Sequence, residues 1–295
     1  MKGISAVVAT YNRSKELERL LDSMLANKCE ALEVIIVDQN TNNLIDGLIA
    51  QYRDRLEINH LKMTIANQSM ARNLGAVKAK YDVVCFPDDD CWFDDHTLNG
   101  VLKHFREHSS TDLLVIGWNQ GRKPGRLSYP DRLTKADIFS FRAAGYVTYV
   151  LFFNRSIFQS IGGFNEALGL GRYIGGGEDT EITFRTASKD LYIAYDTSLT
   201  VNHKYTEMSS RDLPSIRARE RAMGFLYATY KVPFYVTLRG FVAPLVKMVI
   251  GLPAKKSRNY YNTFLARAEG YAYARKTRNE PLNNKNNIAQ TITNS

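Results

Sequence analysis

The chain has 295 residues and is 44% hydrophobic, so it can bury one substantial core, either a single large domain or one domain with an appendage. A net charge of +9 makes nucleic acid an obvious partner. However, the sequence has no zinc-finger spacing, no basic heptads and no aromatic RNA-binding signature, so we expect no nucleic-acid partner.

The expected elements of the first half alternate between apolar strands and amphipathic helices. A strand over 4–9 precedes a helix that Ser14 can cap, with Leu17, Leu20, Leu21 and Met24 on one face. Further strands are expected at 34–37, ending at Asp38, and at 58–63, 82–86 and 113–118. Helices are expected at 42–54, 67–79 and 94–107. This order predicts an α/β fold with a mostly parallel sheet flanked by helices.

The second half is less regular. Residues 119–145 are expected to be irregular, followed by a strand at 146–153, a short helix at 154–161 and a helix starting near Glu178. The last strands are expected at 191–195 and 199–203, and a C-terminal helical extension follows. We therefore divide the chain into a catalytic domain (1–210), a basic helical extension (211–278) and a disordered tail (279–295).

Three consecutive carboxylates, Asp88, Asp89 and Asp90, follow the apolar strand expected at 82–86. Ligands bind outside the carboxyl ends of parallel strands, and Asp38 ends another such strand. Neighbouring carboxylates repel unless a cation neutralises them, and carboxylate oxygens suit Mg²⁺ or Mn²⁺. The triplet therefore predicts a metal site, with a solvated acidic turn as the alternative.

A second acidic site, Glu178 and Asp179, follows three glycines at the start of an expected helix. Acidic residues are favourable at a helix N-terminus, so these residues are also explained as a simple helix start. A base that is separate from a metal site is what a transfer to an attacking hydroxyl requires.

Six motifs follow one another along residues 3–205: Val8-Ala9-Thr10-Tyr11-Asn12-Arg13, Ile35-Ile36-Val37-Asp38, Ala71-Arg72-Asn73-Leu74-Gly75, Pro87-Asp88-Asp89-Asp90, Gly162-Gly163-Phe164-Asn165-Glu166 and Gly177-Glu178-Asp179-Thr180-Glu181. In type and order they resemble the motifs of the inverting family-2 glycosyltransferases with the GT-A fold. The resemblance implies a GT-A fold and an enzyme that uses a nucleotide-sugar donor.

The resemblance also implies roles for individual residues. Asp179 would be the catalytic base, and Glu178 would hold the acceptor. Asp90, Asp88 and His203 would bind Mn²⁺ or Mg²⁺. The residues implied in binding the nucleotide-sugar are Thr10, Tyr11, Arg13, Asp38, Arg72, Asp88 and Asp89. A single displacement would invert the sugar, which would pass from a UDP or dTDP donor to a lipid-linked saccharide or a surface polysaccharide precursor.

The charge is concentrated at the C-terminus. Residues 1–203 carry a net charge of −2 and residues 204–295 a net charge of +11. The apolar stretch 234–252 is interrupted by Arg239 and Lys247, which favours a segment lying in an anionic membrane interface over a membrane span. A helix packed on the catalytic domain or on a second subunit explains it equally well.

The cysteines and the start of the chain bear on location. Cys29, Cys85 and Cys91 are few and odd in number, as in a reducing compartment, and no signal-peptide pattern opens the chain. We expect a cytoplasmic protein, or one peripheral to the inner face of the cell membrane.

Two other enzyme classes and one non-enzymatic class share some of these features. An isoprenoid-type synthase needs its carboxylates one turn apart on a helix, whereas Trp92 and Phe93 stand four residues after Asp88 and Asp89. A nucleotidyltransferase usually has a glycine-rich, basic loop after its first strand, which is not found here. A catalytically inactive nucleotide- or membrane-binding module of the same fold is the third alternative. The sequence does not predict an oligomeric state.

Overall fold

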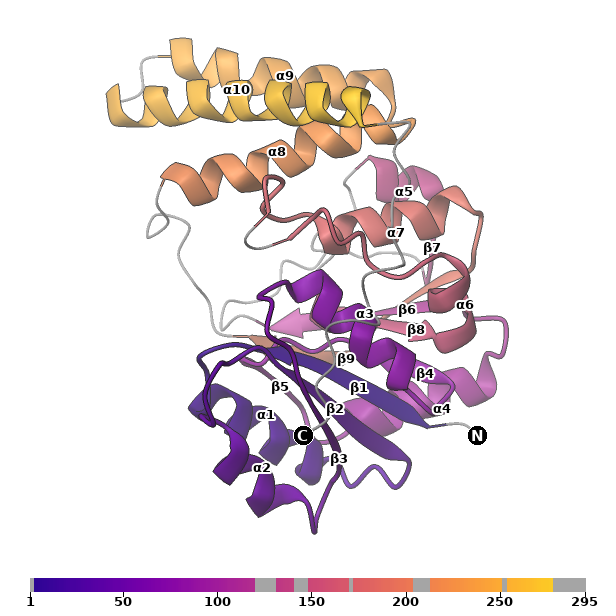
Figure 1. Ribbon diagram of the computed structural model, residues 1–295. Helices are drawn as coiled ribbons and strands as arrows, with labels where there is room; N and C mark the ends of the chain where they lie inside the picture. Colours follow the sequence, from indigo (N-terminus) through magenta and orange to yellow (C-terminus); the bar gives the residue numbers. More distant parts are fainter. Residues whose placement is uncertain are drawn as a thin grey trace.

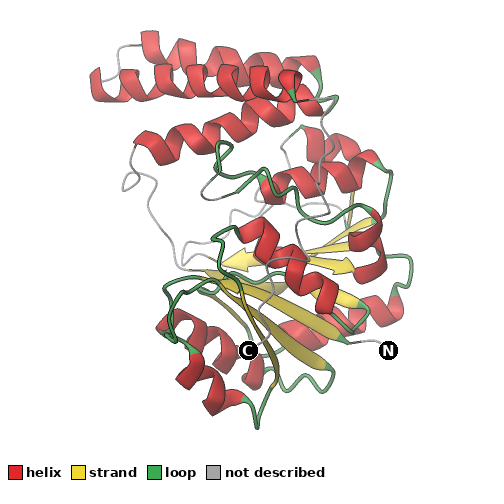
Figure 2. Ribbon diagram, in the orientation of Figure 1, coloured by secondary structure: helices red, strands yellow, loops and turns green. Residues whose placement is uncertain are grey.

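The computed structural model describes residues 3–119, 131–140, 148–169, 172–203, 213–250 and 254–277, without the side chains of 254–257. Within these ranges a central sheet is covered by helices, with three further helices at one end (Figures 1 and 2). The expected disordered tail, 279–295, and most of 119–145 lie outside the described residues.

The sheet runs in the order β3-β2-β1-β4-β8-β6-β9-β5, with β7 paired to β9. The strands are β1 (Ile4–Thr10), β2 (Leu32–Asp38), β3 (Glu57–Lys62), β4 (Val83–Cys85), β5 (Cys91–Phe93), β6 (Leu113–Asn119), β7 (Arg132–Leu133), β8 (Leu151–Asn154) and β9 (Ile193–His203). Strands β3, β2, β1 and β4 are parallel, as is the pair β6–β9. Strand β8 is antiparallel to both of its neighbours, and β5 and β7 are antiparallel to β9. The predicted α/β class is confirmed, with a sheet that is mixed in its second half.

Helices α1 and α2 lie on one face of the parallel half, and α3 lies on the other (Figure 1). The helices of this part are α1 (Lys15–Ala26), α2 (Asp46–Tyr52), α3 (Gln68–Lys78), α4 (Thr97–Glu107), α5 (Lys135–Phe139), α6 (Arg155–Ser160) and α7 (Glu178–Ser188). The apolar face predicted for α1 is buried through Leu17, Leu20, Leu21 and Met24. Ser14 stands at its N-cap position, but its side chain makes no capping hydrogen bond.

Several local expectations were wrong. Strand β5 was missed because its three residues directly follow the Asp triplet and carry no alternating pattern. The two strands expected at 191–195 and 199–203 form the single strand β9, whose pairing shifts register opposite Ile116 and Gly117. Residues 131–140 were expected to be irregular but contain β7 and α5, which a capping box of Thr134 and Asp137 starts.

The strand expected at 146–153 is shorter than predicted. A 3-10 helix, η1 (Thr148–Val150), precedes β8, which begins at Leu151. The first two residues of that expectation lie outside the described ranges.

The C-terminal part contains α8 (Leu213–Thr229), α9 (Phe234–Val249) and α10 (Ala254–Lys276), which pack on one another at one end of the molecule (Figure 1). Helix α9 continues through Pro244, although proline cannot donate the usual hydrogen bond to residue i−4. That carbonyl belongs to Gly240, and Arg267 Nη1 of α10 donates to it instead. Among the described helices, none is both long and apolar enough to cross a membrane.

Helix α8 lies directly on the glycine-rich segment before α7. Gly175 N donates a 3.1 Å hydrogen bond to Ala218 O, and a Cβ at Gly175 would lie 2.4 Å from the Ala218 Cβ. A Cβ at Gly177 would lie 2.7 Å from the Ala222 Cβ. The missing side chains therefore let α8 approach the segment that leads into Glu178.

Candidate active site

The carboxyl ends of β1, β2 and β4 meet at one edge of the sheet because these strands are parallel neighbours. Thr10 and Asp38 stand opposite each other at the ends of β1 and β2, and the Asp triplet follows β4. Pairing of β5 with β9 places His203 opposite Cys91, the residue after the triplet. The fold thus brings together four segments in which sequence reasoning placed site residues.

Each aspartate of the triplet has a cationic or hydrogen-bonding partner. Asp88 Oδ1 lies 2.7 Å from Arg72 Nη2, and Asp89 accepts hydrogen bonds from Arg13 at 2.7 Å and Thr10 at 2.9 Å. Asp90 lies 2.7 Å from Arg13 Nη1 and 3.0 Å from His203 Nε2. These partners offset the mutual repulsion of three adjacent carboxylates.

The three carboxyl groups are not electrostatically equivalent. Burial raises the pKa of Asp88 and of Asp89 above the usual value, and the nearby arginines only partly counter it. Burial acts in the same direction on Asp90, but His203 and Arg13 outweigh it and lower the pKa of that residue. Asp90 is therefore the member of the triplet most strongly held as a carboxylate.

Ligand atoms of Asp88, Asp90 and His203 all lie within 4.8 Å of one another. Two carboxylates and one imidazole are a donor set that suits Mn²⁺ or Mg²⁺ and leaves coordination positions for phosphate oxygens. Asp89 instead pairs with Thr10 and Arg13. The residues present therefore fit a divalent ion held by the first and third aspartates.

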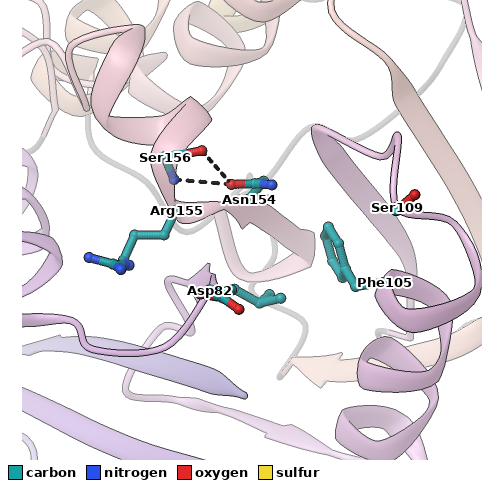
Figure 3. A pocket seen from close by; sticks show the side chains of 7 residues that line it. Asp82, Phe105, Ser109, Asn154, Arg155 and Ser156 are labelled. Carbon is teal, nitrogen blue, oxygen red and sulfur yellow. Dashed lines mark hydrogen bonds between the residues drawn. The ribbon is translucent and has the colours of Figure 1, made fainter. Parts of the chain in front are cut away.

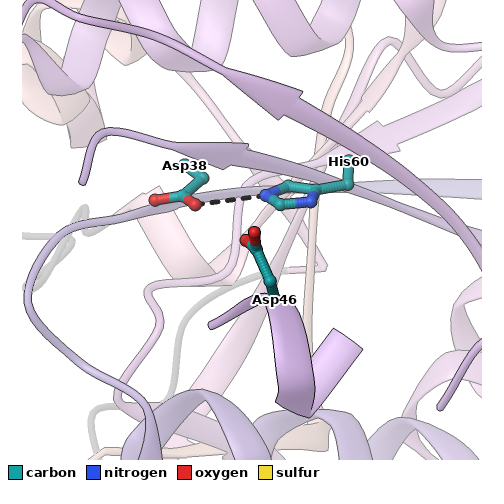
Figure 4. Close-up of side chains that lie close together, drawn as sticks. All are labelled: Asp38, Asp46 and His60. Carbon is teal, nitrogen blue, oxygen red and sulfur yellow. Dashed lines mark hydrogen bonds and ion pairs between the residues drawn. The ribbon is translucent and has the colours of Figure 1, made fainter. Parts of the chain in front are cut away.

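A second acidic cluster consists of Asp38 at the end of β2, Asp46 at the start of α2 and His60 on β3 (Figure 4). Lys62 Nζ lies 2.9 Å from both Asp38 Oδ2 and Asp46 Oδ1, so an ammonium group already neutralises the two carboxylates. This cluster is a network of protein groups, and its charge is balanced without a metal.

Asp38 is fully buried, with its hydrogen-bonding capacity used inside the protein. Asn40 donates to Oδ1 through its backbone and side-chain nitrogens, while His60 Nε2 and Lys62 Nζ lie 3.1 and 2.9 Å from Oδ2. Burial alone would raise its pKa, but these partners lower the pKa to about 2. A direct contact between Asp38 and a nucleotide base would require one of these donors to move. Tyr11, by contrast, is half exposed at the same edge.

The second predicted acidic site begins α7. Gly177 precedes it with a φ of 81°, a conformation that glycine adopts without strain. Asp179 Oδ1 accepts a 2.6 Å hydrogen bond from Thr180 N. Burial and the adjacent charge of Glu178 raise the pKa of Asp179 to about 7, which suits a group that accepts a proton near neutral pH.

Arg72 connects the two acidic sites. Its guanidinium pairs with Asp88 and, at 3.3 Å, with Glu178 Oε1, and the residue is 2% exposed. The resemblance implied that Arg72 binds the nucleotide-sugar, and this bridge was not anticipated. Gln68 Nε2, 3.4 Å from Asp88 Oδ1, and Tyr149, stacked on His203, were also missed. Gln68 lies four residues before Arg72 on α3, a spacing that could have identified it.

A separate hollow lies at the opposite end of β4 (Figure 3). Its lining includes Asp82 and Val83 at the start of that strand and Asn154 at the end of β8. The acidic residues follow the other end of β4, so this hollow is distinct from the candidate active site.

Sequence comparison identifies related proteins. A sequence profile described as Glycosyl transferase family 2 matches residues 5–162, more than half of the chain. TarP of Staphylococcus aureus (strain N315), a poly(ribitol-phosphate) beta-N-acetylglucosaminyltransferase, is 27% identical over 165 residues, covering 53% of this chain and 50% of TarP. Hyaluronan synthase of Pasteurella multocida is 32% identical over 118 residues, covering 39% of this chain and 12% of that protein. The matches thus span half or less of these relatives.

Structure comparison extends the likeness to the C-terminal helices. The crystal structure of S. aureus TarS in complex with UDP-GlcNAc has a TM-score of 0.60 and 16% identity, covering 94% of this chain and 91% of that chain. A mannosyltransferase from Pyrobaculum calidifontis, in complex with GDP-Man and Mn²⁺, has a TM-score of 0.59 and 14% identity, covering 92% of this chain and 75% of that chain. At these identities the comparison concerns the fold, and it confirms the predicted GT-A architecture.

Proposed function

The chain belongs to glycosyl transferase family 2, and on this basis we propose a metal-dependent, inverting transferase that moves a sugar from a nucleotide diphosphate-sugar to an acceptor hydroxyl. One observation carries the proposal. A carboxylate–imidazole group able to hold a cation (Asp88, Asp90, His203) is joined through Arg72 to a separate carboxyl pair (Glu178, Asp179) that can serve the acceptor.

The donor lies at the carboxyl ends of β1, β2 and β4. The nucleotide base lies beside Thr10, Tyr11 and Asp38. Asp38 acts indirectly, by orienting residues such as Asn40 that donate hydrogen bonds to it. Arg13 and Arg72 hold the charged part of the donor, and Asp89 positions Arg13. UDP or dTDP is the nucleotide, and the UDP-GlcNAc bound by TarS favours UDP.

Asp88, Asp90 and His203 are the residues that hold Mn²⁺ or Mg²⁺, and the cation supplies neutralisation of the leaving diphosphate. The complex of the related fold with GDP-Man and Mn²⁺ supports this choice of ion. Arg13 and Arg72, which the carboxylates hold at this edge of the sheet, contribute further positive charge.

Asp179 accepts the proton of the acceptor hydroxyl while that oxygen forms its bond to the anomeric carbon. The bond from the anomeric carbon to the diphosphate oxygen breaks in the same displacement, so the configuration inverts. Glu178, held by Arg72, orients the acceptor. The pKa of Asp179 near 7 allows both proton acceptance and later release at neutral pH.

The acceptor is a saccharide or polyol of a lipid-linked or surface polysaccharide precursor. The activity for which TarP and TarS are named, on poly(ribitol-phosphate), supports a surface polymer, and the hyaluronan synthase of Pasteurella multocida supports a glycan. Residues 1–210 form the catalytic part in this proposal, and residues 211–278 form a helical extension.

The protein acts in the cytoplasm, docked on the inner face of the membrane through α9. Phe234, Leu238, Val242 and Val246 recur every four residues along α9 and are all exposed. Arg239 and Lys247 stand among them, and the sequence has eight Lys or Arg and no acidic residue between Glu220 and Glu269. An apolar stripe surrounded only by cationic residues fits an anionic lipid surface. A second copy of the chain fits it less well, because it would carry the same positive charge.

Thermal unfolding with UDP, dTDP, GDP or CMP, each with Mn²⁺ and again with EDTA, tests the donor and metal together. A ligand at a hundredfold over its Kd adds about 2.7 kcal/mol, which raises the midpoint by several degrees. We expect a shift with UDP or dTDP that needs Mn²⁺ and is lost in Asp90→Ala. Absence of any shift would favour the inactive membrane-binding module, and nucleotide exchange without sugar transfer would favour a nucleotidyltransferase.

A further inference from the structure

The ring of Tyr149 is stacked on the imidazole of His203. The two ring centroids are 4.9 Å apart and their planes differ by 13°. Tyr149 belongs to η1, just before β8, and His203 is the last residue of β9, so the contact joins segments far apart in the chain. The ring of Tyr149 is 5% exposed, and it lies beside one of the three residues suited to holding a cation.

Surrounding elements fix both partners of the stack. Trp118, on β6, packs edge-on against Tyr149 with 6.3 Å between centroids and 63° between planes. Helix η1 contacts β4, β6 and β9. His203 is held by the β5–β9 pairing, in which it stands opposite Cys91. The position of Tyr149 is therefore set by the sheet and is independent of the imidazole.

The stack restricts one rotation of the His203 side chain. An imidazole can turn about its bond to Cβ, and that turn would carry Nε2 away from the 3.0 Å contact with Asp90 Oδ1. A parallel ring on its face blocks the turn. Mutation of hydrogen-bonding groups that orient metal-binding histidines typically costs 10- to 100-fold in metal affinity, and we expect a stacked ring that restricts the imidazole to act at the lower end of this range.

We infer that Tyr149 is a positioning residue that holds the His203 imidazole for cation binding together with Asp88 and Asp90. The inference rests on the proposed function, because it concerns the same cation. The face of the ring performs this task, so an aromatic side chain is required and the phenol oxygen is not.

The test is direct binding of Mn²⁺ to the metal-free full chain, measured by titration calorimetry and by the EPR signal of free Mn²⁺. Tyr149→Leu is expected to weaken binding about 10-fold, and Tyr149→Phe is expected to bind as the wild type does. The Tyr149→Leu change should add no further loss in a His203→Ala background, since the tyrosine acts through that imidazole.

Phe139→Leu is the matched control, because Phe139 is also a buried aromatic in a stacked pair, with Phe184 at 4.8 Å. It should lower the unfolding midpoint without changing Mn²⁺ affinity. Tyr149→Met, which keeps more side-chain volume, serves if the leucine variant does not fold. Unchanged Mn²⁺ affinity in Tyr149→Leu or Tyr149→Met would overturn the inference alone. Absence of Mn²⁺ binding by the wild type would overturn the metal site and the inference with it.

Discussion

Arg72, on α3, forms an ion pair with Glu178, the first residue of α7, with 3.3 Å between Nη1 and Oε1. The same guanidinium pairs with Asp88 at 2.7 Å through its other terminal nitrogen. An arginine that is 2% exposed thus fixes the distance between the predicted cation site and the predicted base. Its planar fork presents a separate terminal nitrogen to each carboxylate in a fixed geometry, which the single ammonium nitrogen of a lysine does not provide.

Arg72→Met is expected to destabilise the protein by about 3 kcal/mol, because it leaves two largely buried carboxylates without their shared partner. Mn²⁺ should restore part of this loss, so the Mn²⁺-induced rise in midpoint should be larger in the variant than in the wild type. Urea unfolding with and without Mn²⁺ measures both effects. Arg53→Met, at an exposed position on the end of α2, should change little. Equal stability of the two variants would contradict the bridging role.

Asp179→Asn is expected to keep nucleotide binding and to lower the transfer rate by at least about a hundredfold, because an amide cannot accept the proton. In the wild type the rate should rise with pH through about 7, where half of Asp179 is a carboxylate, and level off above about pH 8. Glu178→Gln removes the neighbouring charge that raises the pKa of Asp179, so it should move this rise to lower pH.

The transfer rates of the wild type, Asp179→Asn and Glu178→Gln are measured from pH 5 to pH 9, and their nucleotide binding is measured by thermal shift. Normal transfer by Asp179→Asn would remove this residue from the role of base. A pH profile of Glu178→Gln that coincides with that of the wild type would show that Glu178 does not tune Asp179.

The sequence predicted the parts of this fold that repeat a pattern. Buried runs such as those of β1 and β2 and the apolar face of α1 are local, and the Asp triplet follows the strand end where parallel sheets place ligands. The contacts of Arg72 and Tyr149 were beyond prediction because they depend on tertiary packing between distant segments. Arg72 lies 106 residues before Glu178, and Tyr149 lies 54 residues before His203. No periodicity in a single chain encodes them.

The glycines at 175–177 show the same limit. Their sequence indicates mobility and close backbone approach, but the partner that approaches, α8, becomes known only from the structure. The residues of α8 were expected to belong to an extension, and they contact the segment that leads to the predicted base.

Asp38→Asn is expected to lower the free energy of unfolding by about 2 kcal/mol at pH 7, because the pKa of Asp38 lies near 2 in the folded protein against an ordinary 3.8. A depressed pKa stabilises the fold above the unfolded value, and this contribution fades as the pH falls from about 4 towards 2. The difference between wild type and variant should therefore shrink at pH 3. Asp46→Asn, which removes a half-exposed partner of the same Lys62, should cost less than about 1 kcal/mol. Urea unfolding at pH 7 and at pH 3 measures the free energy of unfolding of both variants. Equal losses of this free energy in Asp38→Asn and Asp46→Asn would argue against the special environment of Asp38.

Gly175→Ala is expected to destabilise the protein by about 1–3 kcal/mol and to reduce transfer, since its Cβ would lie 2.4 Å from that of Ala218 and α8 would have to shift. Ala218→Gly in the same chain reopens the space and should recover part of both losses. Gly47→Ala is the control: it lies in α2 with nothing within 4 Å, so it should gain about 0.5–1 kcal/mol. If Gly175→Ala proves as stable and active as the wild type, α8 does not press on this segment.

The combined change Leu238→Ser, Val242→Ser and Val246→Ser is expected to abolish binding to anionic vesicles, because it removes three of the four residues of the exposed apolar stripe of α9. Flotation with vesicles of mixed neutral and anionic lipid measures the bound fraction of the full chain. The wild type should float with these vesicles, less so at high salt, and should not float with purely neutral ones, since Arg239 and Lys247 require anionic headgroups. Val77→Ser, on α3, is the matched control because Val77 is 66% exposed yet lies on the catalytic part.

Vesicle binding that survives the triple change would place the membrane contact elsewhere, and equal failure to float with and without residues 211–295 would exclude the membrane as the partner of α9. A concentration-dependent increase in mass that the triple change removes would identify a second copy of the chain as that partner.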